Sequence, residues 1–312
     1  MSGISKANLH RLVLYGNMVL FILLASSTNV VAKEISTRHD PLWIAFWRVL
    51  IAAPALALVL KLMQRKILLH PVDRWRFFVL AVLAVLGNQL LYILGIAHST
   101  ATHAALLYGT TPAWVLIMAV WLGMEKLRVW KVGGITLSIL GVIIVLAGSG
   151  LSFEGGSLRG DVLLLMAVLS FSAYTTLGKP LVERYGALES TFLVMAFGAV
   201  LYFPIGLPAA LTADYANVTL ADAGMVLYLG LVTSGLVYVL WYWLVSYLRP
   251  TQVAVIMCAQ PPTTFFIASL FQGEQLTPAL LIGATVTLVG ILLTVIGGGE
   301  KRNIDFKPAR GA

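Results

Sequence analysis

The chain has 312 residues, of which 59% are hydrophobic and only 11% are charged. A soluble domain carries roughly 25% charged residues, so this composition excludes an ordinary soluble protein. The formal net charge of +8 would suit a nucleic-acid-binding protein, but the basic residues lie between apolar stretches, and nothing else favours a nucleic-acid partner.

Ten apolar stretches are about as long as the hydrocarbon core of a bilayer, which a helix crosses in roughly 20 residues. Backbone groups in lipid must be satisfied within their own segment, so we expect each stretch to be a helix. The sequence therefore predicts an all-α integral membrane protein with ten transmembrane helices. In chain order the stretches are 12–32, 41–60, 77–97, 104–124, 132–151, 162–178, 190–213, 224–248, 251–273 and 275–299.

The basic residues predict the orientation of these helices. If the N-terminus is cytoplasmic, seventeen of the 21 Lys and Arg residues fall on the inner side. Only Lys33, Arg38 and Arg159 fall on the outer side, and Arg48 lies within a span. Because positive residues are enriched in cytoplasmic loops, we expect both termini to be cytoplasmic and the lipid bilayer to be the main partner.

An internal repeat appears at an offset of 149 residues. Each copy holds five predicted spans, so the two copies enter the membrane from opposite sides and form inverted repeats. We predict a first repeat at 1–150, a glycine- and serine-rich linker at 151–160, a second repeat at 161–299 and a basic cytoplasmic tail at 300–312. The matched positions include Pro112 with Pro261, Glu125 with Glu274, Gly134 with Gly283, Gly141 with Gly290, and Gly148 with Gly297.

These features resemble the drug/metabolite transporter superfamily, in particular its EamA-type exporters with two five-helix repeats. The resemblance is carried by the arginine-bearing segment FWRVLIAAPAL at 46–56, and by segments 112–125 and 261–274, each followed by a glycine-spaced helix. The abundant aromatic residues look most like the bacterial aromatic amino-acid exporter branch. The resemblance implies a bacterial inner-membrane exporter of amino acids or related metabolites, without catalytic residues, a cofactor or a metal.

The inverted repeat itself favours transport, because exchanging the conformations of two equivalent halves gives alternating access to a substrate near the midplane. We expect export of aromatic or large neutral amino acids. The alternatives are another metabolite, such as a drug, sugar or nucleotide, and a polytopic membrane enzyme. An enzyme would need clustered catalytic residues, and the sequence has no HExxH, GxSxG or Walker-type motif. No acid lies near the centre of a span, which favours facilitated diffusion over proton coupling; the oligomeric state stays open.

Helical spacing predicts an aromatic substrate site. Asn88 and Tyr92 share one helical face, and Tyr238 and Trp241 share another. The repeat offset pairs Tyr92 with Trp241, so the two rings can enclose a planar or apolar side chain. The alternatives are ordinary helix packing for the rings and a structural interhelical hydrogen bond for Asn88.

Prolines interrupt the fourth and ninth spans. Pro112, Pro261 and Pro262 remove backbone donors, so we expect helix kinks. The carbonyls freed in this way, which can bind a substrate ammonium, lie around Tyr108, Met257 and Cys258. The alternative is a kink that only shapes the helix. The side chains beside these prolines that can add hydrogen bonds are Thr111 and Gln260.

Arg48 is the charged candidate for binding. It lies within the second span, about 10 Å from the start of that helix, and its guanidinium can hold a substrate carboxylate in bidentate fashion. Trp47 beside it can stack or make a cation–π contact. The alternative is a side chain that extends to the outer interface. Glu125 and Glu274 begin helices, where a carboxylate favours a structural role.

Overall fold

The three-dimensional structure is a computed structural model that describes residues 6–99, 104, 107–148, 158–264, 266 and 278–296. Within these ranges the regular structure is entirely helical, which confirms the all-α prediction at that level. Six helices are long and apolar enough to cross a membrane, and the three further apolar helices are shorter. The six are Leu12–Ser36, Pro41–Leu62, Pro71–His98, Leu158–Tyr185, Ala187–Thr212 and Leu220–Tyr247, and the shorter ones are Leu107–Trp121, Val129–Ile144 and Leu281–Thr294.

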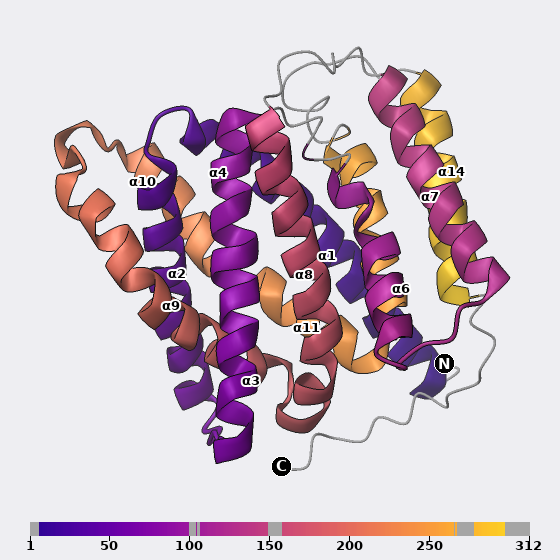
Figure 1. Cartoon of the computed structure of the whole chain (residues 1–312), viewed down its shortest axis with the longest axis horizontal. Helices are drawn as coiled ribbons and strands as arrows, with labels where there is room; N and C mark the ends of the chain where they lie inside the picture. The colour runs from indigo at the N-terminus through magenta and orange to yellow at the C-terminus, as the bar shows by residue number, and fades with distance from the viewer. Residues whose placement is uncertain are drawn as a thin grey trace, which may run out of the picture.

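Figure 1 shows the described helical elements, coloured in chain order from indigo at the N-terminus to yellow at the C-terminus. The first half contains α1 (Lys6–Ser36), α2 (Pro41–Leu62), α3 (Pro71–Ala81), η1 (Val82–Leu90), α4 (Leu91–His98), α6 (Thr111–Trp121) and α7 (Val129–Gly148). The second half contains α8 (Leu158–Tyr185), α9 (Ala187–Thr212), η2 (Tyr215–Asn217), α10 (Leu220–Tyr228), η3 (Leu229–Val237), α11 (Tyr238–Tyr247), α12 (Pro250–Ala254), η4 (Val255–Ala259) and α14 (Pro278–Ile296).

The predicted spans overlap described helices with ends up to seven residues apart, but the ninth, 251–273, is described only through residue 264 and at 266. Helix α8 begins at Leu158, so the last three residues of the predicted linker are already helical. The rest of the linker, Glu274 and the basic tail lie outside the described residues. The count of ten spans and the inversion of the halves stay predictions.

Helix starts follow from the local sequence. Asp40 precedes Pro41, and its carboxylate accepts a hydrogen bond from the backbone N–H of Leu42 at 2.6 Å. Helix α10 begins with a capping box in which Thr219 and Asp222 satisfy each other's backbone N–H groups. These caps fix where each helix enters the bundle.

The third long helix of each half carries the same irregularity. In Pro71–His98 the segment η1 is π-helical over nine residues, and in Leu220–Tyr247 the segment η3 is π-helical over nine residues. The two helices begin 149 residues apart, at the predicted repeat offset. π-Turns in helices occur frequently at functional sites, so this pair marks where to look for the site.

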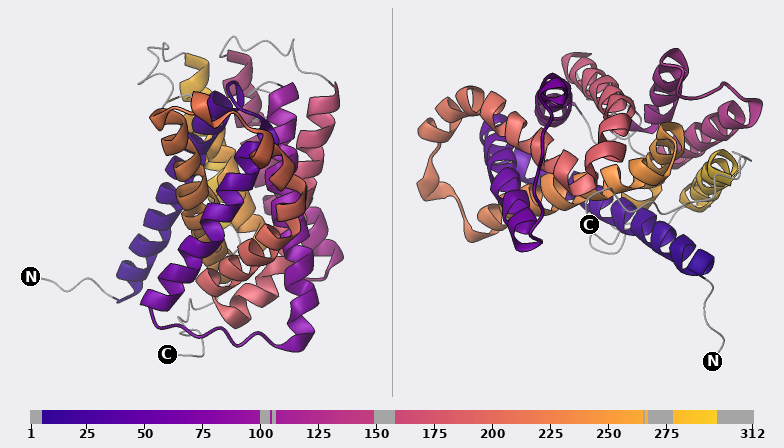
Figure 2. Two further views of the ribbon diagram at one scale, coloured as in Figure 1. Left: turned by 90° about the vertical axis from the view of Figure 1, so that its left-hand side faces the viewer. Right: turned by 90° about the horizontal axis from the view of Figure 1, so that it is seen from below.

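Helices α7 and α14 pack closely along one edge of the bundle (Figures 1 and 2). A Cβ atom at Gly134 would lie 2.9 Å from the carbonyl oxygen of Gly290, and one at Gly141 would lie 2.7 Å from that of Gly283. Residue numbers rise on α7 as they fall on α14, so the two helices are antiparallel. Small residues allow the backbones to approach this closely.

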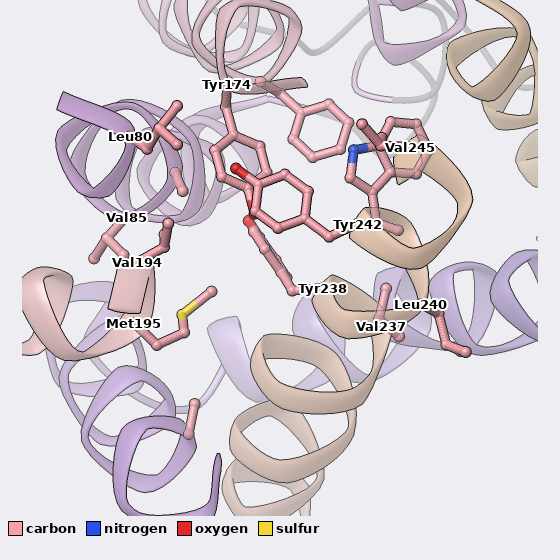
Figure 3. Packing of buried hydrophobic residues seen from close by; sticks show 14 of the residues in the cluster. Leu80, Val85, Tyr174, Val194, Met195, Val237, Tyr238, Leu240, Tyr242 and Val245 are labelled. Carbon is pink, nitrogen blue, oxygen red and sulfur yellow. The ribbon is translucent and has the colours of Figure 1, made fainter. Parts of the chain in front are cut away.

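The largest apolar cluster gathers buried residues of both halves, from α1 to η4. Figure 3 shows the rings of Tyr174, Tyr238 and Tyr242 together in this cluster, opposite Val194 and Met195. Tyr174 and Tyr242 stack with ring centroids 4.6 Å apart. The aromatic content of the second half therefore contributes mostly to packing of the bundle.

Candidate functional site

A buried polar network lies where the two π-helical segments face the rest of the bundle. At its centre the amide of Asn88 donates to the hydroxyl of Tyr108 at 2.7 Å and to the carbonyl oxygen of Ala167 at 3.1 Å. The hydroxyl of Tyr238 donates to the Asn88 side-chain oxygen at 2.9 Å. Asn88 therefore joins both halves of the chain, and it brings together three of the predicted site residues.

Arg48 approaches the same network from α2. Its side chain is buried, with 3% exposure, and its Nε donates to the hydroxyl of Ser234 at 3.2 Å. Ser234 in turn donates to the side-chain oxygen of Gln89 at 2.8 Å. Arg48 therefore does not extend to the outer interface, and it points its charge into a network of neutral groups.

The guanidinium of Arg48 lacks a full set of partners. Among the described residues no group accepts a hydrogen bond from its Nη1, although that atom is buried. None of the ion pairs in the described part of the chain includes Arg48. A buried charge without a carboxylate partner is costly, and a bound anion would offset that cost.

Tyr92 and Tyr108 form an aromatic wall beside the network. Their rings meet edge to face with centroids 5.5 Å apart. The hydroxyl of Tyr92 donates to the side-chain oxygen of Asn29 on α1 at 2.8 Å. The π faces of such rings attract an ammonium group as well as apolar side chains.

The two predicted tryptophans lie in different surroundings. Trp241 is 1% exposed, packs against Phe21 and Phe171 at 5.0 Å each, and donates its indole N–H to Thr175 at 3.1 Å. Its ring belongs to the packed core in this structure, and the pairing of Tyr92 with Trp241 around a substrate stays a prediction. Trp47 is half-buried, and among the described residues its buried indole N–H finds no acceptor.

Regular α-helix is interrupted at Thr110, before Pro112, and gives way to a 3₁₀ segment before Pro261 and Pro262. Residues 107–109 are helical and Thr110 forms a turn. Helix α6 then begins at Thr111, with Pro112 in its first turn. The hydroxyl of Thr111 donates to the carbonyl oxygen of Tyr108 at 2.6 Å. The carbonyl that we expected to be free therefore has an internal partner here.

The corresponding segment of the second half is the 3₁₀ helix η4, which ends just before Pro261 and Pro262. The carbonyl oxygen of Met257, also expected to be free, accepts from the backbone N–H of Gln260. Gln260 is buried, and its carbonyl oxygen accepts from the hydroxyl of Ser26 at 3.4 Å. The segment packs against both halves rather than presenting open carbonyls.

Glu125 forms a structural ion pair. It contacts Lys131 at the start of α7, with both side chains almost completely buried, and it accepts from the backbone N–H of Thr251 at 3.0 Å. This arrangement fixes the start of α12 to the loop before α7. The structural role predicted for Glu125 agrees with these contacts.

A cleft of about 540 Å³ opens at one end of the bundle, lined by residues that include His39, Trp43 and Asp222. Trp43 donates its indole N–H to the hydroxyl of Tyr215 at 3.3 Å. Beside the cleft, a hydrogen bond to Glu34 raises the pKa of the Arg38 guanidinium, which therefore stays charged. No cluster of three metal-ligating side chains occurs among the described residues.

Several members of the polar network were missing from the predicted site. The members that the sequence analysis did not predict as site residues are Ser234, Gln89, Asn29 and Met195. Ser234 and Gln89 carry a detectable signal, since both lie in segments at the repeat offset where a polar residue interrupts an apolar run. Asn29 and Met195 carry none.

Six helices of membrane length among the described residues, with a buried arginine and buried tyrosines between them, define a multi-pass membrane protein. The sequence matches the EamA-like transporter family twice, at residues 14–147 and 158–296. The chain belongs to the EamA-like transporter family and is a multi-pass membrane transporter.

Relatives of this chain occur in archaea, bacteria and plants. An uncharacterized transporter of Archaeoglobus fulgidus is 29% identical over 284 residues, which cover 89% of this chain and 95% of that protein. The uncharacterized transporter YetK of Bacillus subtilis is 27% identical over 301 residues, covering 95% and 89%. The protein WALLS ARE THIN 1 of Arabidopsis thaliana is 25% identical over 265 residues, which cover 76% of this chain and 66% of that protein.

A solved crystal structure has the same fold, with a TM-score of 0.73 over 89% of this chain and 95% of the other. Its sequence identity to this chain is 17%, so the likeness concerns the fold alone.

Proposed function

We propose that this protein exports amino acids with aromatic or other large neutral side chains by alternating access, and that Arg48 binds the substrate carboxylate. The observation that carries the proposal is the buried Nη1 of Arg48, which has no acceptor among the described residues. A carboxylate can accept from Nη1 and Nη2 together while Nε keeps its bond to Ser234, and such charge-assisted pairs are about twice as strong as neutral hydrogen bonds. The two repeats matched by the family support the alternating-access part of the proposal.

The groups around Arg48 suit the rest of an amino acid. Tyr92 and Tyr108 present aromatic surface to an apolar or planar side chain, and their π faces can attract the ammonium group. Asn88 and Gln89 supply neutral oxygen and nitrogen atoms that can exchange their internal hydrogen bonds for bonds to a substrate. Because Arg48 forms no ion pair with the residues that the structure describes, no such pair has to be broken before a carboxylate binds.

The test is a competition panel in liposomes that contain the purified protein and take up labelled phenylalanine. The competitors are phenylalanine, phenylalaninamide, phenethylamine, glucose, a nucleotide and a cationic dye. Loss of a charge-assisted contact weakens binding by about 1.5–3 kcal/mol, so we expect phenylalaninamide to compete roughly 10- to 100-fold less well than phenylalanine. Equal competition by the amide would remove Arg48 from the proposal.

Two other results would change the substrate class. Competition by the nucleotide alone would favour a phosphorylated metabolite, since Arg48 also suits a phosphate. Competition by the dye alone would favour a drug transporter.

The energy source is tested in the same liposomes. We expect labelled phenylalanine to equilibrate without an imposed pH gradient, because no Asp or Glu lies near the centre of a predicted span. Accumulation above equilibrium only when a pH gradient is imposed would instead indicate proton coupling.

A further inference from the structure

Two aspartates occupy the same position in the two halves of the chain. Asp73 is the third residue of α3 and Asp222 is the third residue of α10, exactly one repeat offset of 149 residues apart. Their side chains are 0% and 3% exposed, although both lie at helix ends rather than in the middle of the bundle. Buried carboxylates need partners, and each of these two aspartates has partners in the other half of the chain.

Asp73 joins the first half to the second. One of its oxygens lies 2.7 Å from Nη1 of Arg184 and accepts from the hydroxyl of Tyr185 at 2.6 Å. Both partners lie in the last turn of α8, the first helix of the second half. Arg76, one turn further along α3, contacts the other oxygen at 3.2 Å. We name Asp73, Arg184 and Tyr185 the inner clasp.

Asp222 joins the second half to the first in the same way. Its oxygens lie 3.2 Å from Nη1 of Arg38 and 3.3 Å from Nε2 of His39. Both partners follow the end of α1, the first helix of the first half. Thr219 donates to the same carboxylate at 2.7 Å as part of the helix cap. We name Asp222, Arg38 and His39 the outer clasp.

The two clasps lie at opposite ends of the molecule. The start of α8 is next to the end of α4, since a Cβ atom at Gly160 would lie 2.6 Å from the carbonyl oxygen of His98. Asp73 therefore contacts the other end of α8, roughly 40 Å away at 1.5 Å per residue. Tyr92 on α4 reaches Asn29 on α1, so α1 ends at the same face as His98. Figure 1 shows α10 near one end and α3 near the other.

When a clasp opens, its arginine moves into water and its aspartate keeps a local partner, Arg76 for Asp73 and Thr219 for Asp222. The arginines are 52% and 45% exposed, so water can replace the aspartate as their partner. Ion pairs with an exposed member contribute little to stability compared with pairs buried on both sides. The pair of Glu125 with Lys131 gives the contrast, because both of its side chains are buried and its separation would leave two unpaired charges inside the protein.

We propose that Asp73 and Asp222 are gating residues: the inner clasp closes the cytoplasmic side of the transport path, the outer clasp closes the opposite side, and one opens at a time during transport. This inference rests on the proposed alternating-access function. In the structure both clasps are formed at once around the network of Arg48. Since each clasp crosses between the halves, its release lets the halves separate at that end alone.

The test measures distances between spin labels at each face, in a Cys258→Ser background. One label pair, at Thr37 and Leu220, reports the outer face, and another, at Val72 and Glu183, reports the inner face; all four side chains are exposed. The variants are Asp222→Asn and Asp73→Asn, which keep the side-chain shape and remove the charge. Matched controls are Asp214→Asn in the outer loop and Arg74→Gln beside Asp73 on the exposed side of α3.

We expect Asp222→Asn to raise the fraction of molecules with a long outer distance about fivefold and to leave the inner distance unchanged, as expected when one ion pair with an exposed member is lost. Asp73→Asn should do the reverse, and the controls should resemble the parent protein. Unchanged distances in both variants would overturn the proposal, and so would separation of both faces in each variant.

Two further variants test the proposal if the aspartate variants do not fold. Arg38→Gln and Arg184→Gln remove the exposed member of each clasp, and the same one-sided separation is expected; its absence would count against the gates. The distance measurement needs no substrate. A protein that gates as described but does not move phenylalanine would therefore overturn the proposed function and leave the gating residues in place.

Discussion

The α7–α14 pair and the network around Arg48 differ in how the two halves contribute to them. In the α7–α14 pair, residues at the repeat offset contact each other: the hydroxyl of Ser138 donates to the carbonyl oxygen of Thr287 at 3.4 Å. In the network, Arg48 and Asn88 have no polar counterpart, because residues 149 positions later are Phe197 and Val237. Packing is shared between the halves, whereas the charged group belongs to one of them.

This difference has a physical reason. Two halves that exchange conformations need equivalent packing surfaces, and glycine or serine contacts provide them without regard to a ligand. An amino acid has no two-fold symmetry, so a site that orients its carboxylate must place the cation on one side. Substitution of Gly141 in the packed pair and of Arg48 in the network should therefore have effects of opposite sign on stability.

The largest effect is expected from Gly141→Leu. A Cβ atom at Gly141 would lie 2.5 Å from the backbone nitrogen of Thr287, so the added side chain forces α7 and α14 apart. Overpacking of this kind costs about 3 kcal/mol of the free energy of unfolding, measured by chemical denaturation in detergent. Gly133→Leu is the matched control, since a Cβ atom at Gly133 meets nothing within 4 Å. Equal losses in the two variants would contradict close packing at Gly141.

Arg48→Met should have the opposite effect on stability. It replaces a buried, incompletely paired cation with an apolar side chain of similar length, so we expect the free energy of unfolding to rise by about 2 kcal/mol. Uptake of labelled phenylalanine should fall at least tenfold in the same variant. A variant that loses stability as well as uptake would indicate that Arg48 is a structural residue.

The effect of Asn88→Leu on the free energy of unfolding should lie between those of Gly141→Leu and Arg48→Met. The substitution removes the partner of two tyrosine hydroxyls and of the Ala167 carbonyl, and the loss should be about 2 kcal/mol. Asn17→Leu is the control, because Asn17 only donates to Val13 on its own helix and should change stability by less than about 0.5 kcal/mol. A similar loss in both variants would show that the network adds nothing to an ordinary polar-to-apolar exchange.

The smallest effect concerns the contact between α1 and η3. The hydroxyls of Thr28 and Thr233 lie 2.9 Å apart, and interhelical bonds of this kind contribute about 0.6 kcal/mol in membrane proteins. Thr28→Val and Thr233→Val should each lower the free energy of unfolding by that amount. The loss in the double variant should be no larger than the loss in either single variant. Additive losses in the double variant would mean that the two hydroxyls do not act as a pair.

Much of this protein was determined by the sequence itself. The length of the apolar stretches and the backbone chemistry in lipid predict helices. The recurrence of proline, glutamate and glycine at a fixed offset predicts two related halves, and one family model matches each half separately. A charged residue within a span, Arg48, is identifiable as a site candidate because its burial is costly wherever its side chain points.

Only the tertiary structure decided which partners these residues have. Trp241 and Tyr92 are equally aromatic in the sequence, yet one donates to Thr175 within the core and the other to Asn29 beside the network. The rotation of each helix about its axis and the two π-helical segments set these directions, and both depend on packing between elements far apart in the chain. For the same reason the missing partner of Arg48, on which the proposed substrate site rests, is a property of the assembled bundle rather than of the sequence.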